Sequence, residues 1–331
     1  MGLLNPKNPN AVLNKKSIFA FVYGEPGIGK TALAFSAGRT YLFDCDDEGS
    51  IRAKNRGHVT DVVEDEASKQ DLENPENGIT VAEFFAAVKN KQIVREIKSA
   101  TGKEVDTIII DNVASLYNML LESKKKSNPS LAKNNLKLYG EAKTDMCAFI
   151  KSLKKTGKNI IILIHVKLND AKAKPDGSDS LVNIITAICD VYARMSISME
   201  AGQQVRHISF DPDEDGFGKN AGNLPKMRIP ELHKLGNWFM EKVIKPTLEV
   251  LNSKSISEIE TIEKIDSFCS TLILCNNADE VNVFINELSL LKEENEGAYT
   301  IIRNKLKQKI ANLPIVLNAE TKQYEDVSPA N

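Results

Sequence analysis

The chain has 331 residues, and its 43 Lys and Arg nearly balance its 45 Asp and Glu, for a formal net charge of −2. This balance gives no overall attraction to nucleic acid or to a membrane surface, so any such site must be a local patch. The five cysteines include no C-x-x-C pair, which argues against a disulfide framework or a zinc site, and no apolar run approaches the roughly 20 residues that cross a bilayer. We therefore expect a reduced, cytoplasmic protein with no membrane partner.

The first predicted elements surround a phosphate-binding loop. Residues 24–31 read Gly-Glu-Pro-Gly-Ile-Gly-Lys-Thr, which fits G-x-x-x-x-G-K-[ST] without a mismatch. The apolar run before the loop predicts a buried strand, and residues 31–38 predict a helix that ends at Gly38. Glycines let successive backbone N–H groups curl round phosphates, and the helix N-terminus adds a favourable dipole. These flanks favour a nucleotide site over an incidental glycine-rich turn.

The loop thus predicts a bound nucleoside triphosphate, with ATP as the default. Lys30 is expected to reach the β- and γ-phosphates, and the Thr31 hydroxyl to bind Mg²⁺. The residues expected to contact the nucleotide are consecutive: Gly24, Glu25, Pro26, Gly27, Ile28, Gly29, Lys30, Thr31 and Ala32.

Carboxylates gather at the end of the second predicted strand, residues 40–45: Asp44, Asp46, Asp47 and Glu48. Hydrolysis needs a group that orients the attacking water. Four acids so close together cannot all be catalytic, so Asp46 and Glu48 are the candidates and the others are interpreted as a solvated turn. A short strand is expected at residues 58–63, and Thr80 is expected to cap a helix that runs to about residue 98.

A second acid for the metal follows the apolar strand at residues 106–111. Asp111 stands at its carboxyl end, where ligand sites of α/β sheets lie, and is predicted to hold the hydrated Mg²⁺. The alternative is that Asp111 is only the N-cap of a helix starting at Val113. Helical patterns are expected on either side of the polar stretch 123–135.

The next strand, residues 159–165, ends at His165 on the same edge of the sheet. This position suits a sensor of the γ-phosphate, although a lone histidine is also commonly a hydrogen-bonded structural residue. A loop is expected at residues 166–180, and then a β-hairpin of residues 190–199 and 204–211 that turns at Ala201-Gly202.

The pattern changes near residue 251. Ser257 with Glu260, and Asn277 with Glu280, predict the starts of two helices, and a third is expected at residues 299–313. Their apolar stripes are most simply packing faces. We divide the chain into a polar arm (residues 1–16), a P-loop domain with a mainly parallel sheet (17–246), a helical accessory region (247–317) and a flexible tail (318–331).

These motifs in this order resemble the RecA-type ATPase core, above all the short RecA-core ATPases of bacteriophages associated with single-strand annealing and recombination. The likeness covers roughly residues 17–235 and rests on the P-loop, the acids after the second strand, Ile-Ile-Ile-Asp at 108–111 and the polar residue ending the next strand. It implies an α/β, RecA-like fold and ATP hydrolysis with Mg²⁺. The family usually has a glutamate where this chain has Asp46, and RecA has a glutamine in place of His165.

The resemblance also implies single-stranded DNA as a partner, bound by loops at roughly residues 121–139 and 166–180. The first is locally basic, which suits phosphate contacts, and Tyr139 is its only candidate for base stacking. The alternative is an ordinary solvated run of lysines. The lysines expected to contact DNA in the two segments are Lys124, Lys125, Lys126, Lys133, Lys137, Lys167, Lys172 and Lys174.

Related ATPases place the nucleotide between subunits of a ring or filament, and a neighbour supplies a cation. Lys219 is the candidate for that catalytic cation, with Arg194 and Arg206 on the predicted hairpin. We predict an ATP-hydrolysing, single-stranded-DNA-binding recombination or annealing ATPase of phage type that forms a homo-oligomer. The alternative is a nucleotide-switched replication or assembly accessory, either helicase- or loader-like or gripping a protein partner through the C-terminal helices.

Overall fold

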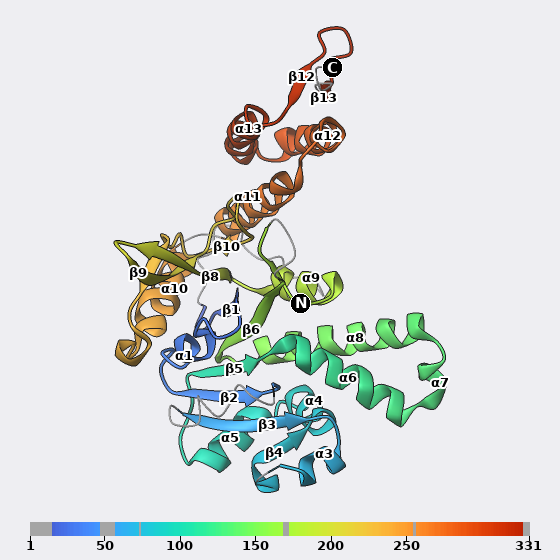
Figure 1. The fold of residues 1–331 in the computed structure, drawn as a ribbon, viewed down its shortest axis with the longest axis vertical. Helices are drawn as coiled ribbons and strands as arrows, with labels where there is room; N and C mark the ends of the chain where they lie inside the picture. Colours follow the sequence, from blue (N-terminus) through green and yellow to red (C-terminus); the bar gives the residue numbers. More distant parts are fainter. Residues whose placement is uncertain (1–14, 47–56, 73, 168–171, 254–255, 327–331) are drawn as a thin grey trace, which may run out of the picture.

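The computed structural model describes residues 15–46, 57–72, 74–167, 172–253 and 256–326. Strands and helices alternate to build one large sheet, with three further helices stacked beyond one end of it (Figure 1). The predicted α/β fold class with a mainly parallel sheet and a C-terminal helical region is confirmed. The predicted polar arm, apart from its last two residues, lies outside the described residues.

The sheet has eleven strands, nine of which follow the order β11-β9-β8-β1-β6-β5-β2-β3-β4. Pairing is parallel from β8 to β4, and the β9 and β11 pairs are antiparallel. Two short strands add to it: β7 (Lys174–Pro175) pairs with β6, and β10 (Lys219–Asn220) with β8. The nine strands are β1 (Phe19–Gly24), β2 (Thr40–Asp44), β3 (His58–Val63), β4 (Gly78–Thr80), β5 (Thr107–Asp111), β6 (Asn159–Lys167), β8 (Val191–Glu200), β9 (Gln203–Ser209) and β11 (Met227–Ile229).

Helices cover both faces of this sheet, as a buried parallel sheet requires. On β1, for example, Phe19, Phe21 and Tyr23 pack into one hydrophobic cluster, whereas Ala20 and Val22 pack into the other. The first cluster includes side chains of α4, α5, α6, α8 and α9, and the second those of α1, η3 and α10. The helices are α1 (Lys30–Ala34), α3 (Glu66–Gln70), η1 (Pro75–Asn77), α4 (Val81–Lys89), α5 (Ile93–Thr101), α6 (Val113–Ser127), α7 (Pro129–Ala132), α8 (Asn135–Lys154), α9 (Asp179–Ile188), η2 (Leu232–Lys234), η3 (Met240–Ile244) and α10 (Lys245–Ser253).

The register of the parallel strands aligns their carboxyl ends. Gly24 of β1 lies opposite His165 of β6, and Asp44 of β2 lies opposite Asp111 of β5. Because β6 lies between β1 and β5, His165 stands between the P-loop and Asp111. Polar residues that are far apart in the sequence therefore meet at one edge of the sheet.

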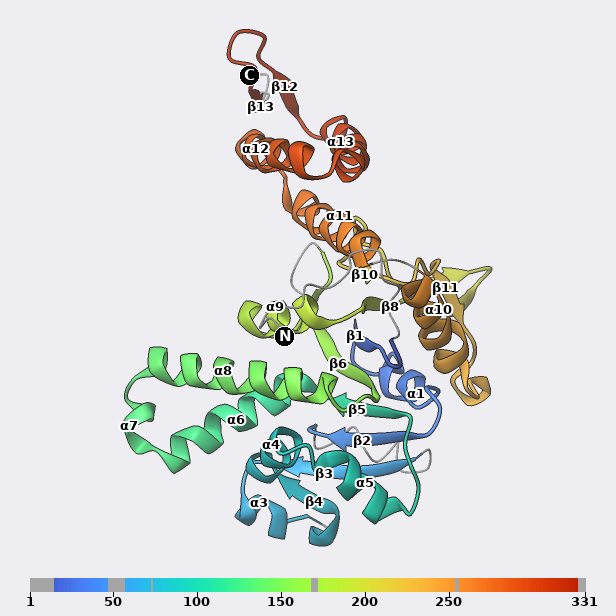
Figure 2. The ribbon, with the colours of Figure 1, turned by 180° about the vertical axis from the view of Figure 1, so that it is seen from behind.

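Two helical regions differ from the prediction. The helix expected at residues 80–98 is split into α4 and α5, and Lys91 between them has a positive φ of 59°. The polar stretch 123–135 is itself helical: α6, α7 and α8 form a hairpin that projects away from the sheet (Figures 1 and 2). Asn128 and Asn134 cap α7 and α8, and Leu131 is buried between the arms, which explains why a polar sequence forms helix here.

The C-terminal region contains α11 (Ile256–Leu274), α12 (Ala278–Glu294) and α13 (Glu296–Ile310), with its own small hydrophobic core. As predicted, Asn277 caps α12 by accepting a bond from the Glu280 N–H. The segment expected as a flexible tail differs from the structure, because β13 (Tyr324–Asp326) pairs with β12 (Ile315–Leu317). Similarly, α10, placed in the accessory region from residue 247, packs through Leu248 on the core of the sheet.

Within the described ranges, no helix combines the length and the apolar character that crossing a membrane requires.

Three aromatic rings that pack together beside β2 allow a prediction of the stability lost when a cavity is made in the core. The Phe84 ring of α4 lies 4.2 Å from that of Phe43 and 5.1 Å from that of Phe149. We expect Phe84→Ala to lower the free energy of unfolding by about 3–5 kcal/mol in a denaturant titration. Leu136→Ala, at a side chain that is 87% exposed, is the control and should stay within about 0.5 kcal/mol of wild type. Equal losses in the two variants would contradict this packing.

Candidate functional site

The P-loop leaves β1 at Gly24 and enters α1 at Lys30. Gly27 and Gly29 have left-handed φ values of 74° and 104°, which side-chain-bearing residues rarely adopt. A Cβ at Gly29 would also lie 2.7 Å from Leu232 Cδ1, so the leucine side chain would have to shift if any other residue stood there. Backbone conformation is therefore the reason for glycine at both positions.

Backbone donors converge in this loop. Among the described residues, the N–H groups of Gly27, Gly29, Lys30 and Thr31 find no acceptor. Unpaired N–H groups at a loop and a helix start are suited to the oxygens of a phosphate. This arrangement fits the triphosphate that the sequence predicts.

Lys30 is buried, with only 4% of its surface exposed. Its Nζ lies 3.0 Å from the carbonyl oxygens of Gly24 and Glu25 and 3.0 Å from His165 Nδ1. Burial lowers the pKa of Lys30 to about 8, and the charges of Asp111 and Asp46 oppose that shift. Because no carboxylate among the described residues contacts this buried ammonium, the negative charge of a bound phosphate would directly stabilise its charged form.

Thr31 and Asp111 form the predicted metal pair. The Thr31 hydroxyl donates to Asp111 Oδ2 at 2.5 Å, and burial raises the pKa of the Asp111 carboxyl. A hydroxyl and a carboxylate beside a phosphate cradle are ligands that suit Mg²⁺. The alternative reading of Asp111 as a helix cap is wrong, because Asn112 is the N-cap of α6 and accepts from the N–H groups of Ala114 and Ser115.

The two remaining candidates at this edge also come together. His165 Nε2 lies 3.3 Å from Asp46 Oδ2, and the side-chain amide of Asn112 donates to the same oxygen at 3.4 Å. Since the Lys30 ammonium can only donate, His165 Nδ1 accepts from it, and we assign the ring proton to Nε2, facing Asp46. The structure therefore joins Lys30, His165, Asp46 and Asn112 in one hydrogen-bonded chain. Glu48, the other candidate base, lies outside the described residues.

Two contacts near the P-loop, one made by Asn112 and one by Arg206, were not predicted from the sequence. Asn112 directly follows Asp111, and its place before a helical run was a readable capping signal, but its bond to Asp46 depends on the fold. Arg206 of β9 donates from Nε to the Ile28 carbonyl oxygen at 2.9 Å, so the hairpin supports the P-loop of its own chain.

The other proposed cations lie elsewhere in the same chain. Lys219 is 3.6 Å from Glu263 of α11, and its strand β10 pairs with the start of β8, away from the P-loop end of the sheet. Arg194 is buried and forms ion pairs with Asp213 and Asp215. The structure places neither residue in the nucleotide site of its own chain, and a role across a subunit boundary stays a prediction.

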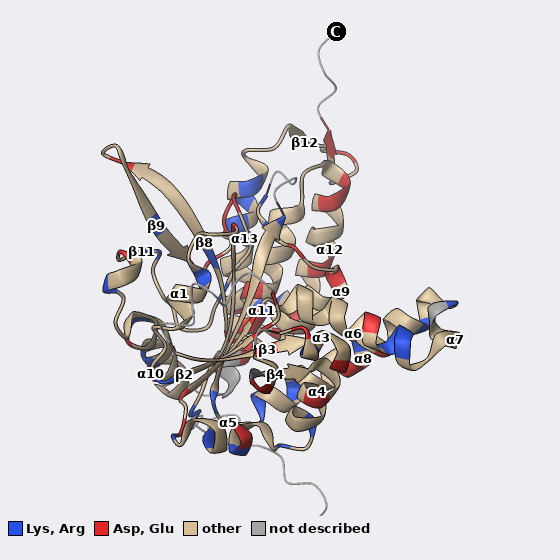
Figure 3. Cartoon of the chain, turned by 60° about the horizontal axis from the view of Figure 1, so that its bottom comes forward, with Lys and Arg blue, Asp and Glu red and all other residues tan. Residues whose placement is uncertain are grey.

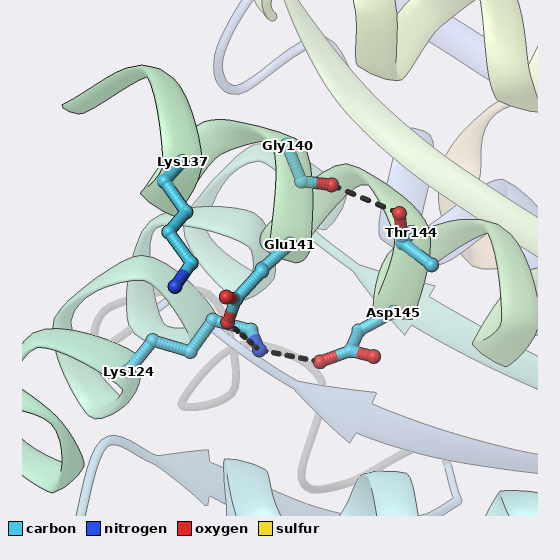
Figure 4. A pocket seen from close by; sticks show the side chains of 6 residues that line it. All are labelled: Lys124, Lys137, Gly140, Glu141, Thr144 and Asp145. Carbon is cyan, nitrogen blue, oxygen red and sulfur yellow. Dashed lines mark hydrogen bonds and ion pairs between the residues drawn. The ribbon is translucent and has the colours of Figure 1, made fainter. Parts of the chain in front are cut away.

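Most lysines of the first expected DNA segment are already paired. Lys124 bridges Asp145 at 2.6 Å and Glu141 at 3.9 Å, Lys125 pairs with Glu122, and Lys126 pairs with Glu64 and Asp65. Figure 3 shows the blue and red segments side by side along this hairpin. A hollow of about 420 Å³ lies between α6 and α8 (Figure 4). Lys124 and its two carboxylate partners line this hollow, and Lys137 also points into it.

Lys133 and Lys137 differ from these three. Both are exposed, and neither forms an ion pair within the described part of the chain. Leu136 is 87% exposed and Tyr139 52% exposed on the same part of α8. The tip of the hairpin thus presents two exposed lysines and an exposed aromatic ring.

The second expected DNA segment contacts the C-terminal helices. Lys172 Nζ donates to the carbonyl oxygen of Ile273 near the end of α11, Lys174 lies in β7, and Lys167 is exposed at the end of β6. Residues 168–171 lie outside the described residues.

Comparisons with known proteins give one match to a protein family. The family described as AAA domain matches residues 16–221, which includes the P-loop, Asp46, Asp111 and His165. Among solved structures, the KaiC-like protein of the hyperthermophilic archaeon Pyrococcus horikoshii OT3 matches with 11% identity and a TM-score of 0.33, over 58% of this chain and 76% of that chain. No curated protein is similar enough in sequence to count as a relative.

The buried charge of Lys30 predicts a pH-dependent cost to stability. Since the pKa falls from 10.5 to about 8 on folding, the unfolded chain holds this proton more tightly. Stability relative to Lys30→Met should then rise between pH 8 and pH 10.5, by at most about 3 kcal/mol. Denaturant titrations of both proteins without nucleotide, at pH 7 and pH 10, measure the difference. We also expect Lys30→Met to be the more stable protein at pH 7, and a pH-independent difference would contradict the burial of a charged Lys30.

Proposed function

The chain belongs to the AAA domain family and has a P-loop ATPase core, and from this premise we propose that it hydrolyses ATP with Mg²⁺ and binds single-stranded DNA. One observation supports the proposal of ATP hydrolysis most directly. Side chains from the P-loop and from the ends of β2, β5 and β6 form two neighbouring hydrogen-bonded groups at one edge of the sheet, Lys30–His165–Asp46 and Thr31–Asp111. Together they offer a phosphate-binding amine, a pair of candidate metal ligands and a carboxylate able to orient water.

Each residue has a distinct task in this proposal. The P-loop N–H groups and Lys30 bind the phosphates, while Thr31 and Asp111 would hold Mg²⁺, which neutralises phosphate charge when bound. Asp46 accepts the proton of the attacking water. When Lys30 turns to the phosphates, His165 loses the donor at Nδ1, so its ring is free to report whether a γ-phosphate is present.

Asp46 is one methylene shorter than the glutamate usual in the resembled family. Its carboxylate is already held by His165 Nε2 and the Asn112 amide, at 3.3 and 3.4 Å. This fixed position supports Asp46 as the base in place of Glu48.

For DNA, we propose the tip of the α6–α8 hairpin as the contact surface. Lys133 and Lys137 offer phosphate contacts that no carboxylate of the described chain already occupies, and Tyr139 offers a ring on which a base can stack. The helix α6 is capped by Asn112, next to Asp111, and runs to Ser127 in the projecting hairpin, so it links the hairpin to the nucleotide site. We propose an annealing or recombination ATPase of phage type that works as a homo-oligomer.

A second candidate is a nucleotide-switched module that grips a protein partner. Its specific support is the bond from Lys172, in the segment after His165, to the end of α11. Val283 and Leu290 of α12 are 59% and 72% exposed, which would suit such a partner.

Replacing the proposed base should separate binding from chemistry. We expect Asp46→Asn to lower kcat by about 100-fold or more while the Kd for a fluorescent ATP analogue changes by less than about three-fold, because the P-loop is untouched. Lys30→Ala should lose nucleotide binding itself. An active Asp46→Asn variant would move the role of base to Glu48.

Charge reversal at the hairpin tip tests the DNA surface. We expect Lys133→Glu with Lys137→Glu to weaken single-stranded DNA binding strongly, and to reduce the log–log salt slope by about 0.7 for each lost phosphate contact. Lys151→Glu with Lys155→Glu, near the other end of α8, is the matched control. Fluorescence anisotropy across a salt series makes the measurement, and equal losses in both double variants would remove the site from the tip.

A further inference from the structure

We propose that Asn112 is a positioning residue for hydrolysis: one side-chain amide both caps α6 and fixes the carboxylate of Asp46. This inference rests on the proposed function, in which Asp46 orients the attacking water. It assigns a task to a residue that directly follows Asp111, the proposed metal ligand.

The two ends of the Asn112 amide have different partners. Its Oδ1 accepts from the N–H groups of Ala114 and Ser115 at 2.8 and 3.3 Å. Its Nδ2 donates to Asp46 Oδ2 at 3.4 Å. A flipped amide would point N–H at N–H and oxygen at carboxylate, so the cap and the carboxylate together determine which end faces Asp46. The residue is also buried, with 5% of its surface exposed, which limits other rotamers.

The contact orients the carboxylate of Asp46. His165 and Asn112 both bond to Oδ2. Among the described residues, nothing bonds to Oδ1, which leaves that oxygen to accept a proton from water. The Asp46 side chain is itself 42% exposed and stands at the end of β2, so these two donors determine its direction.

The two donors are not equivalent during turnover. His165 is also bonded to Lys30, which must turn towards the phosphates, so the ring can move when nucleotide binds. Asn112 cannot follow such a movement without giving up the cap of α6. The carboxylate therefore keeps one fixed donor, and misplacement of a catalytic group by even about 1 Å can cost a factor of 100 in rate.

Two substitutions separate the cap from the contact. Ser and Asp are both good N-caps, so Asn112→Ser and Asn112→Asp retain α6 but remove the amide donor. Asp additionally brings a second carboxylate towards Asp46. The matched controls are Asn277→Ser and Asn277→Asp, because Asn277 caps α12 through the N–H of Glu280 at 2.9 Å, in another core.

The test measures kcat, KM, the Kd for a fluorescent ATP analogue and the unfolding midpoint of every variant. We expect Asn112→Ser to lower kcat by about 10- to 100-fold, and Asn112→Asp by more, while Kd stays within about two-fold. Both Asn277 variants should keep the wild-type kcat. In an Asp46→Asn background, Asn112→Ser should change the remaining rate by less than about two-fold, because no base remains there to be positioned.

Three results would overturn the inference. The first is a wild-type kcat in Asn112→Ser. The second is a parallel loss of kcat, nucleotide affinity and stability, which would leave only a capping role. The third is a full effect of Asn112→Ser in the Asp46→Asn background. Failure of the wild type to hydrolyse ATP would overturn the proposed function together with this inference, whereas the three results above leave hydrolysis itself standing.

Discussion

Parallel pairing of β1, β6, β5 and β2 is the constraint on which the site depends. In this register Gly24 lies opposite His165 and Asp44 lies opposite Asp111, so the strand ends meet at one edge. The insertion of β6 between β1 and β5 puts the imidazole of His165 between the phosphate loop and the proposed metal ligands. Each further contact, from Lys30 to Asp46, follows from that alignment.

This edge concentrates buried charge, which costs stability. Lys30 and Asp111 are both buried, and burial shifts the pKa of each towards its neutral form. Binding of phosphates and a cation would relieve both, so the groups that cost most in the nucleotide-free chain are those that the proposed ligands would stabilise.

The sequence predicted much of this fold, and the reasons are local. Short apolar runs gave β1, β2, β3, β5 and β6, and the turn at Ala201-Gly202 gave the hairpin of β8 and β9. The P-loop follows from spacing alone. Helices on either side of residues 123–135 were predicted, but α7 was missed, because the asparagines of this polar stretch cap α7 and α8.

Contacts between distant segments could not be read in this way. The pairing of Lys126 with Glu64 and Asp65 joins residues about sixty positions apart, and it changes which lysines are available to DNA. The bond from Asn112 to Asp46 and the bond from Arg206 to Ile28 likewise exist only because the sheet brings those segments together. The spacing of a motif identifies candidate binding residues at the end of one strand. The groups that orient those residues come from neighbouring strands, which the motif does not contain.

We propose that one site hydrolyses ATP and is coupled to single-stranded DNA. The most direct test is the rate of ATP hydrolysis by the full chain with Mg²⁺, with and without single-stranded DNA, over a series of salt concentrations. We expect DNA to stimulate hydrolysis, and the stimulation to fade as salt rises, since phosphate contacts are screened. Hydrolysis indifferent to DNA, with no DNA binding even beside a non-hydrolysable ATP analogue, would contradict it.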